Sequence, residues 1–333
     1  MLRVALVGCG SVGRRRAGVL GADEGATLVA VTDLDPARAA KLAAETGAET
    51  VDSWQAAVGR DDIDAVIVSA TNDVHAPAGV AALAAGKHAL VEKPLARTPE
   101  EASQLVRAAE ESGCVLQTGF NHRWYPSIQR ARQLVAEGAI GEPVMARCRY
   151  GHGGRQGWER EWFTQPSMSG GGTFLDNGVH ALDLFRWFLG DFSEATGMVG
   201  ALAWPIAAED NGVGVFRTAD GRLATLHSSW TQWDPVFSFE VFGREGFVSI
   251  ADARTLTLGS RSHGPLIGAV PTQTWQMPGA HDAWADDWRE FAAAIREGRQ
   301  PLADGRAGLQ AVRMAYAVYE ASTTGRTVRL RKQ

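Results

Sequence analysis

The chain has 333 residues, of which 45% are hydrophobic and 21% are charged, and its net charge is -5 at pH 7. This length predicts two domains, and the balance of apolar and charged residues is that of an ordinary globular protein. Charges of both signs are interspersed and form no basic stripe, which argues against nucleic acid as a partner.

The N-terminus and the cysteines favour the cytoplasm. Met1 runs directly into a strand-like segment without a signal-peptide pattern, and no apolar run is long enough to cross a membrane, so we expect no membrane partner. Cys9, Cys114 and Cys148 are odd in number, widely spaced and lack a Cys-x-x-Cys pattern. We therefore expect buried thiols, with neither a disulfide framework nor a metal site.

The N-terminal segment has the pattern of a dinucleotide site. An apolar strand at residues 2–7 runs into a Gly-x-Gly-x-x-Gly turn, and a helix is expected through about Ala22. The first glycine permits the tight turn, the second admits a pyrophosphate close to the backbone, and the third lets the helix pack closely on the strand. The free N–H groups at the start of the helix would face the phosphate charge. The cofactor contacts expected in this turn are Gly8, Gly10, Ser11, Val12 and Gly13.

A carboxylate that follows Gly13 by 20 residues completes this pattern. Asp33 ends an apolar strand, where it can accept hydrogen bonds from the ribose hydroxyls of NAD and would repel the extra phosphate of NADP. NAD is therefore the expected cofactor. Two alternatives stay open: Asp33 as a loop acid that starts a turn into Pro36, and a contribution from Arg38 that favours NADP.

Strands and helices then alternate as far as residue 118. Buried strands are expected at residues 63–68, 89–92 and 114–118, with helices between them. This alternation predicts an α/β fold with a doubly wound parallel sheet, in which ligands lie beyond the carboxyl ends of the strands. The further cofactor contacts expected at these ends are Thr71, Asn72, Glu92, Lys93 and Asn121.

The run at residues 89–95 ends in an acid, a base and a proline. Pro94 cannot continue a paired ladder, so the strand is expected to emerge into a crevice at Glu92 and Lys93. This places Lys93 where a charge can take part in chemistry. A solvated lysine on a loop is the alternative.

The pattern changes after Asn121. A bridging helix is expected at about 125–137, strands in uninterrupted series between residues 192 and 258, and two closing helices at about 281–296 and 306–323. Successive strands with turn signals predict an open, mostly antiparallel sheet. We therefore expect a dinucleotide-binding domain at residues 1–121 and an α+β domain for substrate binding and oligomerisation at residues 122–333, with the last helix packing back on the first domain.

A helix of the second segment carries Asp176, His180 and Asp183 at the spacing i, i+4 and i+7, so these side chains share one face. A histidine one turn from an acid can be held in one tautomer and act as a general acid or base near neutral pH. The alternative is a capping acid beside a buried structural histidine. Spacing for only two ligands, without a cysteine pair, argues against a metal.

Aromatic side chains gather in the second segment, since 10 of the 11 tryptophans lie after residue 120. Aromatic faces can stack on a sugar ring, and Trp162 is the one that we assign to the site. In the loop at residues 151–158, His152 and Arg155 are candidate contacts to an acidic or phosphorylated group of a substrate. For Arg155 an exposed loop charge is the alternative.

Four motifs together make the chain resemble the Gfo/Idh/MocA family, the group of glucose-fructose oxidoreductase and inositol dehydrogenase, along nearly its whole length. In chain order they are Gly8-x-Gly10-x-x-Gly13, Glu92-Lys93-Pro94, Gly119-Phe120-Asn121-x-Arg123-x-x-Pro126, and Gly170-Gly171-Gly172 followed by Asp176-x-Gly178-x-His180-x-x-Asp183. One departure is Ala70-Thr71-Asn72, where such proteins often have Thr-Pro-Asn. Asn72 and His75 stay in register with the family.

The resemblance implies a Rossmann domain joined to an open antiparallel sheet, whose exposed face commonly makes homodimers or homotetramers. It also implies catalytic roles for Lys93, Asp176 and His180. His75 and Trp162 complete the expected cofactor contacts. The expected substrate contacts are Lys93, Arg123, Tyr125, His152, Arg155, Asp176 and His180.

The expected activity is a reversible hydride transfer between NAD(P) and a secondary hydroxyl of a sugar, an inositol or a nucleotide-sugar. Lys93 would stabilise the charge on the reacting oxygen, His180 would accept its proton, and Asp176 would orient the imidazole or contact the sugar. Two other classes stay open. One is a glycosidase that uses NAD in a transient oxidation and elimination, and the other is a cofactor-binding regulator without catalysis.

Overall fold

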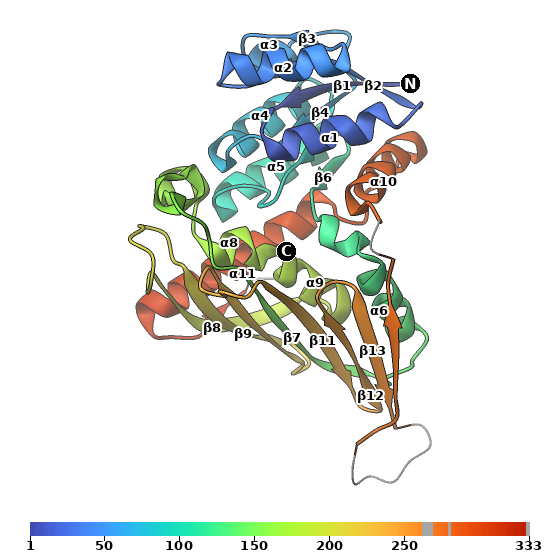
Figure 1. Cartoon of the computed structure of the whole chain (residues 1–333), viewed down its shortest axis with the longest axis vertical. Coiled ribbons are helices and arrows are strands. Elements are labelled where there is room, and N and C mark those ends of the chain that lie inside the picture. The colour runs from blue at the N-terminus through green and yellow to red at the C-terminus, as the bar shows by residue number, and fades with distance from the viewer. Residues whose placement is uncertain (262–268, 279–280, 331–333) are drawn as a thin grey trace. The chain divides into compact units, whose positions relative to one another are not determined.

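A computed structural model describes residues 1–261, 269–278 and 281–330, and within them the chain divides into two compact units (Figure 1). Unit 1 comprises Met1–Asn121, Ser167–Gly170 and Trp284–Val312. Unit 2 comprises His122–Pro166, Gly171–Ala283 and Arg313–Gln333. The chain thus leaves unit 1 after Asn121 and returns to it twice.

Unit 1 is built on a six-stranded sheet in the order β3-β2-β1-β4-β5-β6, and every neighbouring pair is parallel. Strand β4 is a fully buried run of apolar residues, and the residues of β5 after His88 are buried and apolar, as parallel sheets covered on both faces require. The predicted doubly wound parallel sheet is therefore confirmed. The strands are β1 (Leu2–Val7), β2 (Ala26–Thr32), β3 (Glu49–Thr50), β4 (Ala65–Val68), β5 (His88–Val91) and β6 (Leu116–Thr118).

Local sequence signals set the ends of several helices in unit 1. The side chains of Asp35, Ser53 and Thr98 accept backbone N–H groups at the starts of α2, α3 and α5, and left-handed Gly47 and Gly113 end α2 and α5. Among the described residues, no helix combines the length and the apolar run needed to cross a bilayer. The helices that contribute to this unit are α1 (Ser11–Gly21), α2 (Pro36–Thr46), α3 (Trp54–Val58), α4 (Asn72–Ala84), α5 (Pro99–Ser112), α10 (Ala283–Glu297) and α11 (Gly305–Thr324), of which α11 continues into unit 2.

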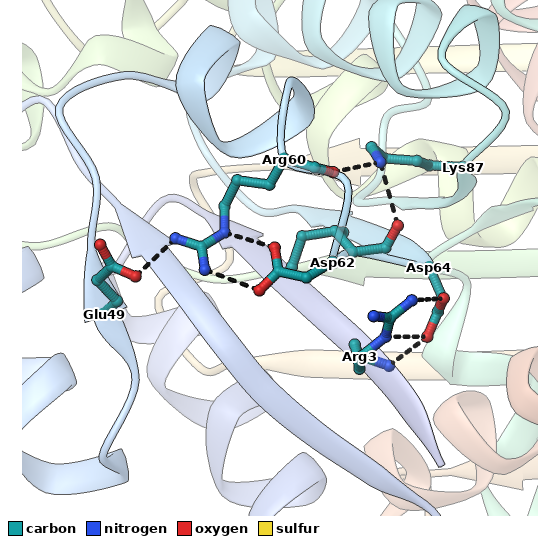
Figure 2. Close-up of polar contacts among 7 residues, drawn as sticks. Arg3, Glu49, Arg60, Asp62, Asp64 and Lys87 are labelled. Atoms are coloured by element: carbon teal, nitrogen blue, oxygen red, sulfur yellow. Dashed lines mark hydrogen bonds and ion pairs between the residues drawn. The ribbon is translucent and has the colours of Figure 1, made fainter.

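Polar side chains tie together the amino ends of the strands in unit 1 (Figure 2). Lys87, which is buried, donates to the carbonyl oxygens of Arg60 and Ile63 at 2.7 and 3.1 Å. Arg3 in β1 binds Asp64, just before β4, with both backbone and guanidinium N–H groups. These contacts occupy the amino edge of the sheet, whereas ligands of such sheets lie at the carboxyl edge. The other pairs drawn are those of Arg60 with Asp62 and Glu49.

The segment at residues 284–312 completes the core of unit 1. Trp288 and Phe291 of α10 lie buried in the cluster formed with α1, β1 and β2. Trp288 Nε1 donates to Asp23 at 2.7 Å, and this hydrogen bond lowers the pKa of the Asp23 carboxyl. We expected residues 122–333 to form the second domain, with only the last helix packing back on the first, so the place of residues 284–312 in unit 1 corrects that boundary. This segment joins unit 1 because its apolar side chains fill the space beside α1.

Unit 2 is built on a nine-stranded sheet in the order β14-β13-β12-β11-β7-β10-β9-β8-β15. Only β7 and β10 run parallel among its pairs in the described part of the chain, so the predicted mostly antiparallel sheet is confirmed. Strand β14 lies beyond the expected series. The strands are β7 (Pro143–Gly151), β8 (Phe192–Gly200), β9 (Asn211–Thr218), β10 (Leu223–Ser229), β11 (Val236–Gly243), β12 (Gly246–Ala251), β13 (Thr255–Ser260), β14 (Thr272–Gln276) and β15 (Val328–Arg329).

Helices α8 (Thr173–Asp176) and α9 (Gly178–Leu189) pack on one face of this sheet, against β7, β9 and β10 (Figure 1). Phe185 of α9 stacks on Phe239 of β11, with ring centroids 5.8 Å apart. Exposure alternates along β9, where Val213 and Val215 are 50% and 37% exposed on the opposite face. One face of the sheet therefore supports the helix that carries His180, and the other presents apolar side chains.

Candidate active site

The turn between β1 and α1 has a close-packed side and an open side. Gly8 has φ of 95°, which favours glycine, and its α-carbon faces the backbone of Ser69 and Ala70. A Cβ on Gly13 would overlap the Gly8 carbonyl oxygen, so α1 starts close against the turn. A Cβ on Gly10 would meet no atom within 4 Å. Tight packing at the outer glycines and space at the middle one fit a pyrophosphate beside the start of α1.

The acid expected to bind ribose lies next to this turn. Asp33 follows β2, and its two carboxylate oxygens accept the backbone N–H groups of Cys9 at 2.7 Å and Asp35 at 2.9 Å. Ser11 and Val12 open α1, where Ser11 is exposed and Val12 is half-buried. The structure therefore places Asp33 beside the backbone that would receive the pyrophosphate.

Two expected cofactor contacts shape the loop beyond β4. The Thr71 hydroxyl donates to the Asp73 carboxylate at 2.5 Å, within the first turn of α4. Asn72 is buried, and its Nδ2 donates to the Ser169 carbonyl oxygen at 2.8 Å. Both polar side chains thus hold the carboxyl end of β4 in a defined conformation.

His75 connects this loop to the segment after β5. Its ring is 1% exposed, with Nδ1 2.8 Å from the Pro94 carbonyl oxygen and Nε2 3.1 Å from the Ala70 carbonyl oxygen. Burial lowers the pKa of His75, although both carbonyl groups act in the opposite direction. A neutral imidazole donates through only one nitrogen, so only one of the two contacts is a conventional hydrogen bond in that form. His75 therefore helps to position the backbone next to Lys93.

A buried ion-pair network lies at the end of β5. The guanidinium of Arg16 is 2.6 Å from Glu92 and 2.7 Å from Asp287, and its side chain is fully buried. The Trp284 ring covers it, with its centroid 4.6 Å from the guanidinium carbon. Burial disfavours the charged guanidinium, but the two carboxylates outweigh burial and raise the pKa of Arg16. Glu92, expected to contact the cofactor, thus binds Arg16 and anchors the end of β5.

Lys93 and Asn121 lie at the carboxyl ends of neighbouring parallel strands. Lys93 is half-buried and follows β5, with its backbone N–H 3.4 Å from Glu92 Oε2. Asn121 is buried and begins the short helix η1 (Asn121–Trp124) after β6. Since all strands of this sheet are parallel, Lys93 stands at the same edge as the glycine turn and Asp33.

In unit 2, the expected acid and histidine come from two consecutive helices. Asp176 ends α8, His180 lies in the first turn of α9, and Asn177 between them keeps helical dihedral angles. The His180 ring packs against His122, with centroids 3.7 Å apart and the two ring planes tilted by 46°. Tyr150 lies 5.3 Å from His122 and 6.4 Å from His180, and burial raises its pKa, so its hydroxyl stays protonated.

The side chains around this histidine pair are aromatic or already ion-paired. Tyr125 and Phe237 lie 4.6 and 5.3 Å from His122, measured between ring centroids. Arg123 makes two hydrogen bonds of 2.6 Å to Asp183, and both side chains are buried. Asp183, which shares the predicted face with His180, is thus bound by Arg123, so this pair fixes α9 relative to η1.

The loop after β7 places its aromatic and basic side chains against one another. His152 packs edge-on against Trp158, with ring centroids 5.1 Å apart. Arg155 lies over the Trp158 ring, with its guanidinium carbon 5.0 Å from the ring centroid. Arg155 also binds Glu161 at 2.6 Å. Trp162 is half-buried and begins the short helix η3 (Trp162–Thr164). The loop is therefore a packed aromatic cluster that carries Arg155 at its surface.

Both halves of the chain match family models. Residues 2–120 match the oxidoreductase family with an NAD-binding Rossmann fold, and residues 128–249 match the GFO/IDH/MocA C-terminal domain. The chain belongs to the GFO/IDH/MocA oxidoreductase family. The predicted family, the oxidoreductase activity and the use of NAD are thereby confirmed.

Three similar proteins illustrate the range of the family. The chain is 32% identical to 1,5-anhydro-D-fructose reductase of Ensifer adhaerens, with 99% of each protein covered. It is 31% identical to inositol 2-dehydrogenase 3 of Saccharopolyspora erythraea, with 98% of this chain and 95% of that protein covered. The crystal structure of GenD2 from gentamicin A biosynthesis in complex with NAD superposes with a TM-score of 0.87 at 28% identity, over 99% of this chain and 97% of that one.

Sequence patterns identified neither His122 nor Asp287 as part of the site. His122 stands between two recognised motif residues, and its contact with His180 depends on the placement of α9 against η1. Asp287 is separated from Arg16 by most of the chain, and no local pattern connects it with the dinucleotide turn. Within the described residues, no group of three or more His, Cys, Asp or Glu side chains is arranged to hold a metal ion.

Proposed function

We propose that this oxidoreductase reversibly oxidises a secondary hydroxyl of a small, uncharged sugar or polyol, with NAD as the hydride acceptor. The observation that carries the proposal is the position of Lys93, at the same sheet edge as the glycine turn and Asp33. Further support comes from unit 2, where His180 lies in a cluster of aromatic and imidazole rings. Two relatives, named for 1,5-anhydro-D-fructose and inositol, are similar over nearly the whole chain.

The residues of unit 1 fit NAD. The open backbone at Gly10 and the start of α1 would hold the pyrophosphate, and Asp33 would bind the ribose hydroxyls. When bound, NAD supplies the nicotinamide ring that accepts the hydride. The protein's own tasks are to bind, to orient and to move one proton. The remaining proposed cofactor contacts are Gly8, Ser11, Val12, Gly13, Thr71, Asn72, His75, Glu92, Lys93, Asn121 and Trp162, with His75 and Glu92 acting through the backbone that they position.

Lys93 is the proposed electrostatic catalyst. Its ammonium group would donate a hydrogen bond to the reacting oxygen and stabilise the negative charge that develops as the hydride leaves. The anchoring of β5 by Glu92 and Arg16, and the contact of His75 with the Pro94 carbonyl, hold the backbone on both sides of Lys93. A fixed donor needs little reorganisation at the moment of reaction.

His180 is the proposed proton acceptor, and Asp176 its orienting acid. A proton would pass from the substrate hydroxyl to the His180 imidazole as the hydride leaves the carbon that bears this hydroxyl. Asp176 precedes His180 by one helical turn, which suits either an orienting contact or a contact to a neighbouring substrate hydroxyl. The adjacent His122 ring restricts the orientation of the His180 ring.

An uncharged substrate is favoured over a nucleotide-sugar or a uronate. The two arginines expected to contact substrate, Arg123 and Arg155, each bind a carboxylate of the chain, Asp183 and Glu161. A substrate phosphate would therefore have to compete with these pairs. Tyr125 and His152 complete the proposed substrate contacts, and aromatic side chains of this kind suit the faces of a sugar or cyclitol ring.

The test is NADH formation at 340 nm, with NAD and NADP measured separately, against inositols, aldoses, anhydro sugars, uronates and nucleotide-sugars. We expect reduction of NAD with an uncharged sugar or polyol. Oxidation confined to charged substrates would contradict the proposed substrate class. Cleavage of a glycoside without net NADH would contradict the dehydrogenase activity in favour of the hydrolytic alternative.

The proposal includes a homo-oligomer in the cytoplasm. Among the described residues, four large apolar side chains on β8, β9 and β10 are exposed on the open face of the sheet in unit 2, and strand register places Met198 directly opposite Val213. Their exposure supports pairing of this face with a second copy of the chain. They are Met198, Val213, Val215 and Leu223.

A further inference from the structure

Glu209 lies just before β9, outside every motif in the sequence. Its Oε2 accepts the Gly172 N–H at 2.6 Å, and its Oε1 accepts the Phe174 N–H at 3.1 Å and the Tyr319 hydroxyl at 2.7 Å. Its backbone carbonyl oxygen accepts the Thr173 N–H at 3.0 Å. One residue thus receives three successive backbone N–H groups at the start of α8 and a hydroxyl from α11. The three N–H groups would otherwise lack a hydrogen-bond acceptor, because they lie at the N-terminus of a helix.

The two glycines before α8 pack closely against Glu209 and Tyr319. A Cβ on Gly172 would overlap the Glu209 carbonyl oxygen, and a Cβ on Gly171 would overlap the Tyr319 hydroxyl. Burial raises the pKa of Glu209 against the effect of its hydrogen bonds, and burial together with the Glu209 carboxylate raises the pKa of Tyr319 well above its usual range. Tyr319 therefore remains a hydroxyl donor at neutral pH.

Backbone hydrogen bonds pass this anchoring along the chain to His180. The Gly172 carbonyl oxygen accepts the Asp176 N–H at 2.8 Å, and the Thr173 carbonyl oxygen accepts the Asn177 N–H at 2.9 Å. The Asn177 carbonyl oxygen then accepts the His180 N–H at 3.3 Å. Asp176 and His180 are thus tied to the turn that Glu209 holds.

The sheet fixes the other side of the same short helix. Ser228 of β10 donates to the Thr173 carbonyl oxygen at 2.8 Å, and the two side-chain hydroxyls lie 2.9 Å apart. Helix α8 has only four residues, too few to be stable by itself, so these external contacts decide where it lies. Glu209 provides more of these contacts than Ser228, since it accepts three N–H groups at the start of α8.

We propose that Glu209 is a positioning residue, which sets the place of Asp176 and His180 by anchoring the start of α8. The inference rests on the proposed function for the roles of those two residues, whereas the anchoring contacts do not depend on it. Glutamine is the informative replacement, because it keeps the shape of glutamate but replaces one acceptor oxygen by an NH2 group. That NH2 group would face an N–H or O–H donor and could not accept its hydrogen bond.

The experiment is an NMR titration of the His180 imidazole in the full chain with NADH bound, using labelled histidine and assigning the signal by its loss in His180→Asn. It compares the unmodified protein with Glu209→Gln, Tyr319→Phe and Glu142→Gln. Glu142 is the matched control, because it makes an exposed ion pair with Arg244 elsewhere in unit 2. The kcat and the affinity for NADH are measured in parallel.

We expect Glu209→Gln to shift the His180 titration midpoint by about half a pH unit or more. The substitution should displace α8, and the surroundings of the His180 ring would change with it. The kcat should fall about tenfold or more, since small misplacements of reacting groups are costly, while NADH affinity stays unchanged. Tyr319→Phe should shift the midpoint less, and Glu142→Gln not at all.

An unchanged His180 titration in folded Glu209→Gln would overturn the inference. If that variant does not fold, Tyr319→Phe decides, and an unchanged titration and kcat there would overturn it as well. A shifted titration in a protein that oxidises no substrate of the panel would support the positioning role of Glu209 and contradict the proposed function alone.

Discussion

We propose that selection between NAD and NADP depends on one carboxylate. Asp33 lies beside the glycine turn, and Arg38, the residue that could favour NADP, is ion-paired with Asp35 at 3.3 Å. Replacing Asp33 by Asn removes the negative charge that would repel a 2′-phosphate. We predict that Asp33→Asn lowers the ratio of the NADP to the NAD dissociation constant by about tenfold or more, which corresponds to about 1.4 kcal/mol.

Quenching of tryptophan fluorescence on titration with NAD or with NADP measures both constants. Glu45→Gln is the matched control, because it removes an exposed carboxylate from the neighbouring α2 without touching the turn. A ratio that stays at the unmodified value in Asp33→Asn would show that another residue sets the preference.

At the scale of elements, a neutral histidine contributes a hydrogen bond beside the start of the β5–β6 pair. His88 Nδ1 accepts the Val115 N–H at 3.0 Å, and burial lowers the pKa of His88 from 6.5, against an opposing effect of Asp64. The unfolded chain therefore takes up a proton near pH 6.5 that the folded protein resists. The free energy of unfolding should fall as the pH drops below about 6.5, until the folded pKa is passed.

His88→Asn tests this dependence, since its side-chain oxygen can still accept the Val115 N–H but does not titrate in this range. Urea unfolding at a series of pH values should show a smaller loss of stability on acidification than in the unmodified protein. Because His75 and His227 also have lowered pKa values, part of the dependence will remain. Identical pH profiles for the two proteins would rule out a contribution from His88.

Regular elements were the part of the fold that sequence predicted well. Apolar runs marked β1, β4 and β5, the first ending at a glycine turn and the last shortly before a proline, because these signals are local. The return of α10 to unit 1 had no local signal. It depends on Trp288 filling a space beside α1, which only the assembled core defines.

The residues of the candidate site likewise fall into those that local sequence signals predicted and those that they did not. Lys93, Asp176 and His180 could be selected because each stands in a motif at a recognisable place on a strand or helix. Glu209 could not, since its role arises from three backbone N–H groups and a tyrosine that are distant in sequence. Contacts between distant parts of the chain, rather than residue type, account for what the sequence did not predict.

At the scale of the whole molecule, the exposed sheet face predicts self-association. Val213 and Met198 are cross-strand partners on β9 and β8, 50% and 79% exposed. Val213→Asp would place a charge in the proposed interface, where burial without a partner is costly. Light scattering after size-exclusion chromatography should give a multiple of 35.6 kDa for the unmodified chain and a smaller particle for the variant. A 35.6 kDa particle for the unmodified chain would contradict the proposed oligomer.

The central claim is that Lys93 stabilises the reacting oxygen during hydride transfer, and the single-turnover rate of NADH formation in Lys93→Met tests it most directly. The substrate is the one identified by the panel, and Lys41→Met, at an exposed position on α2, serves as the matched control. We predict that hydride transfer slows by about a hundredfold or more in Lys93→Met, with the affinity for NAD unchanged. A rate in Lys93→Met equal to that of the control would contradict the assignment.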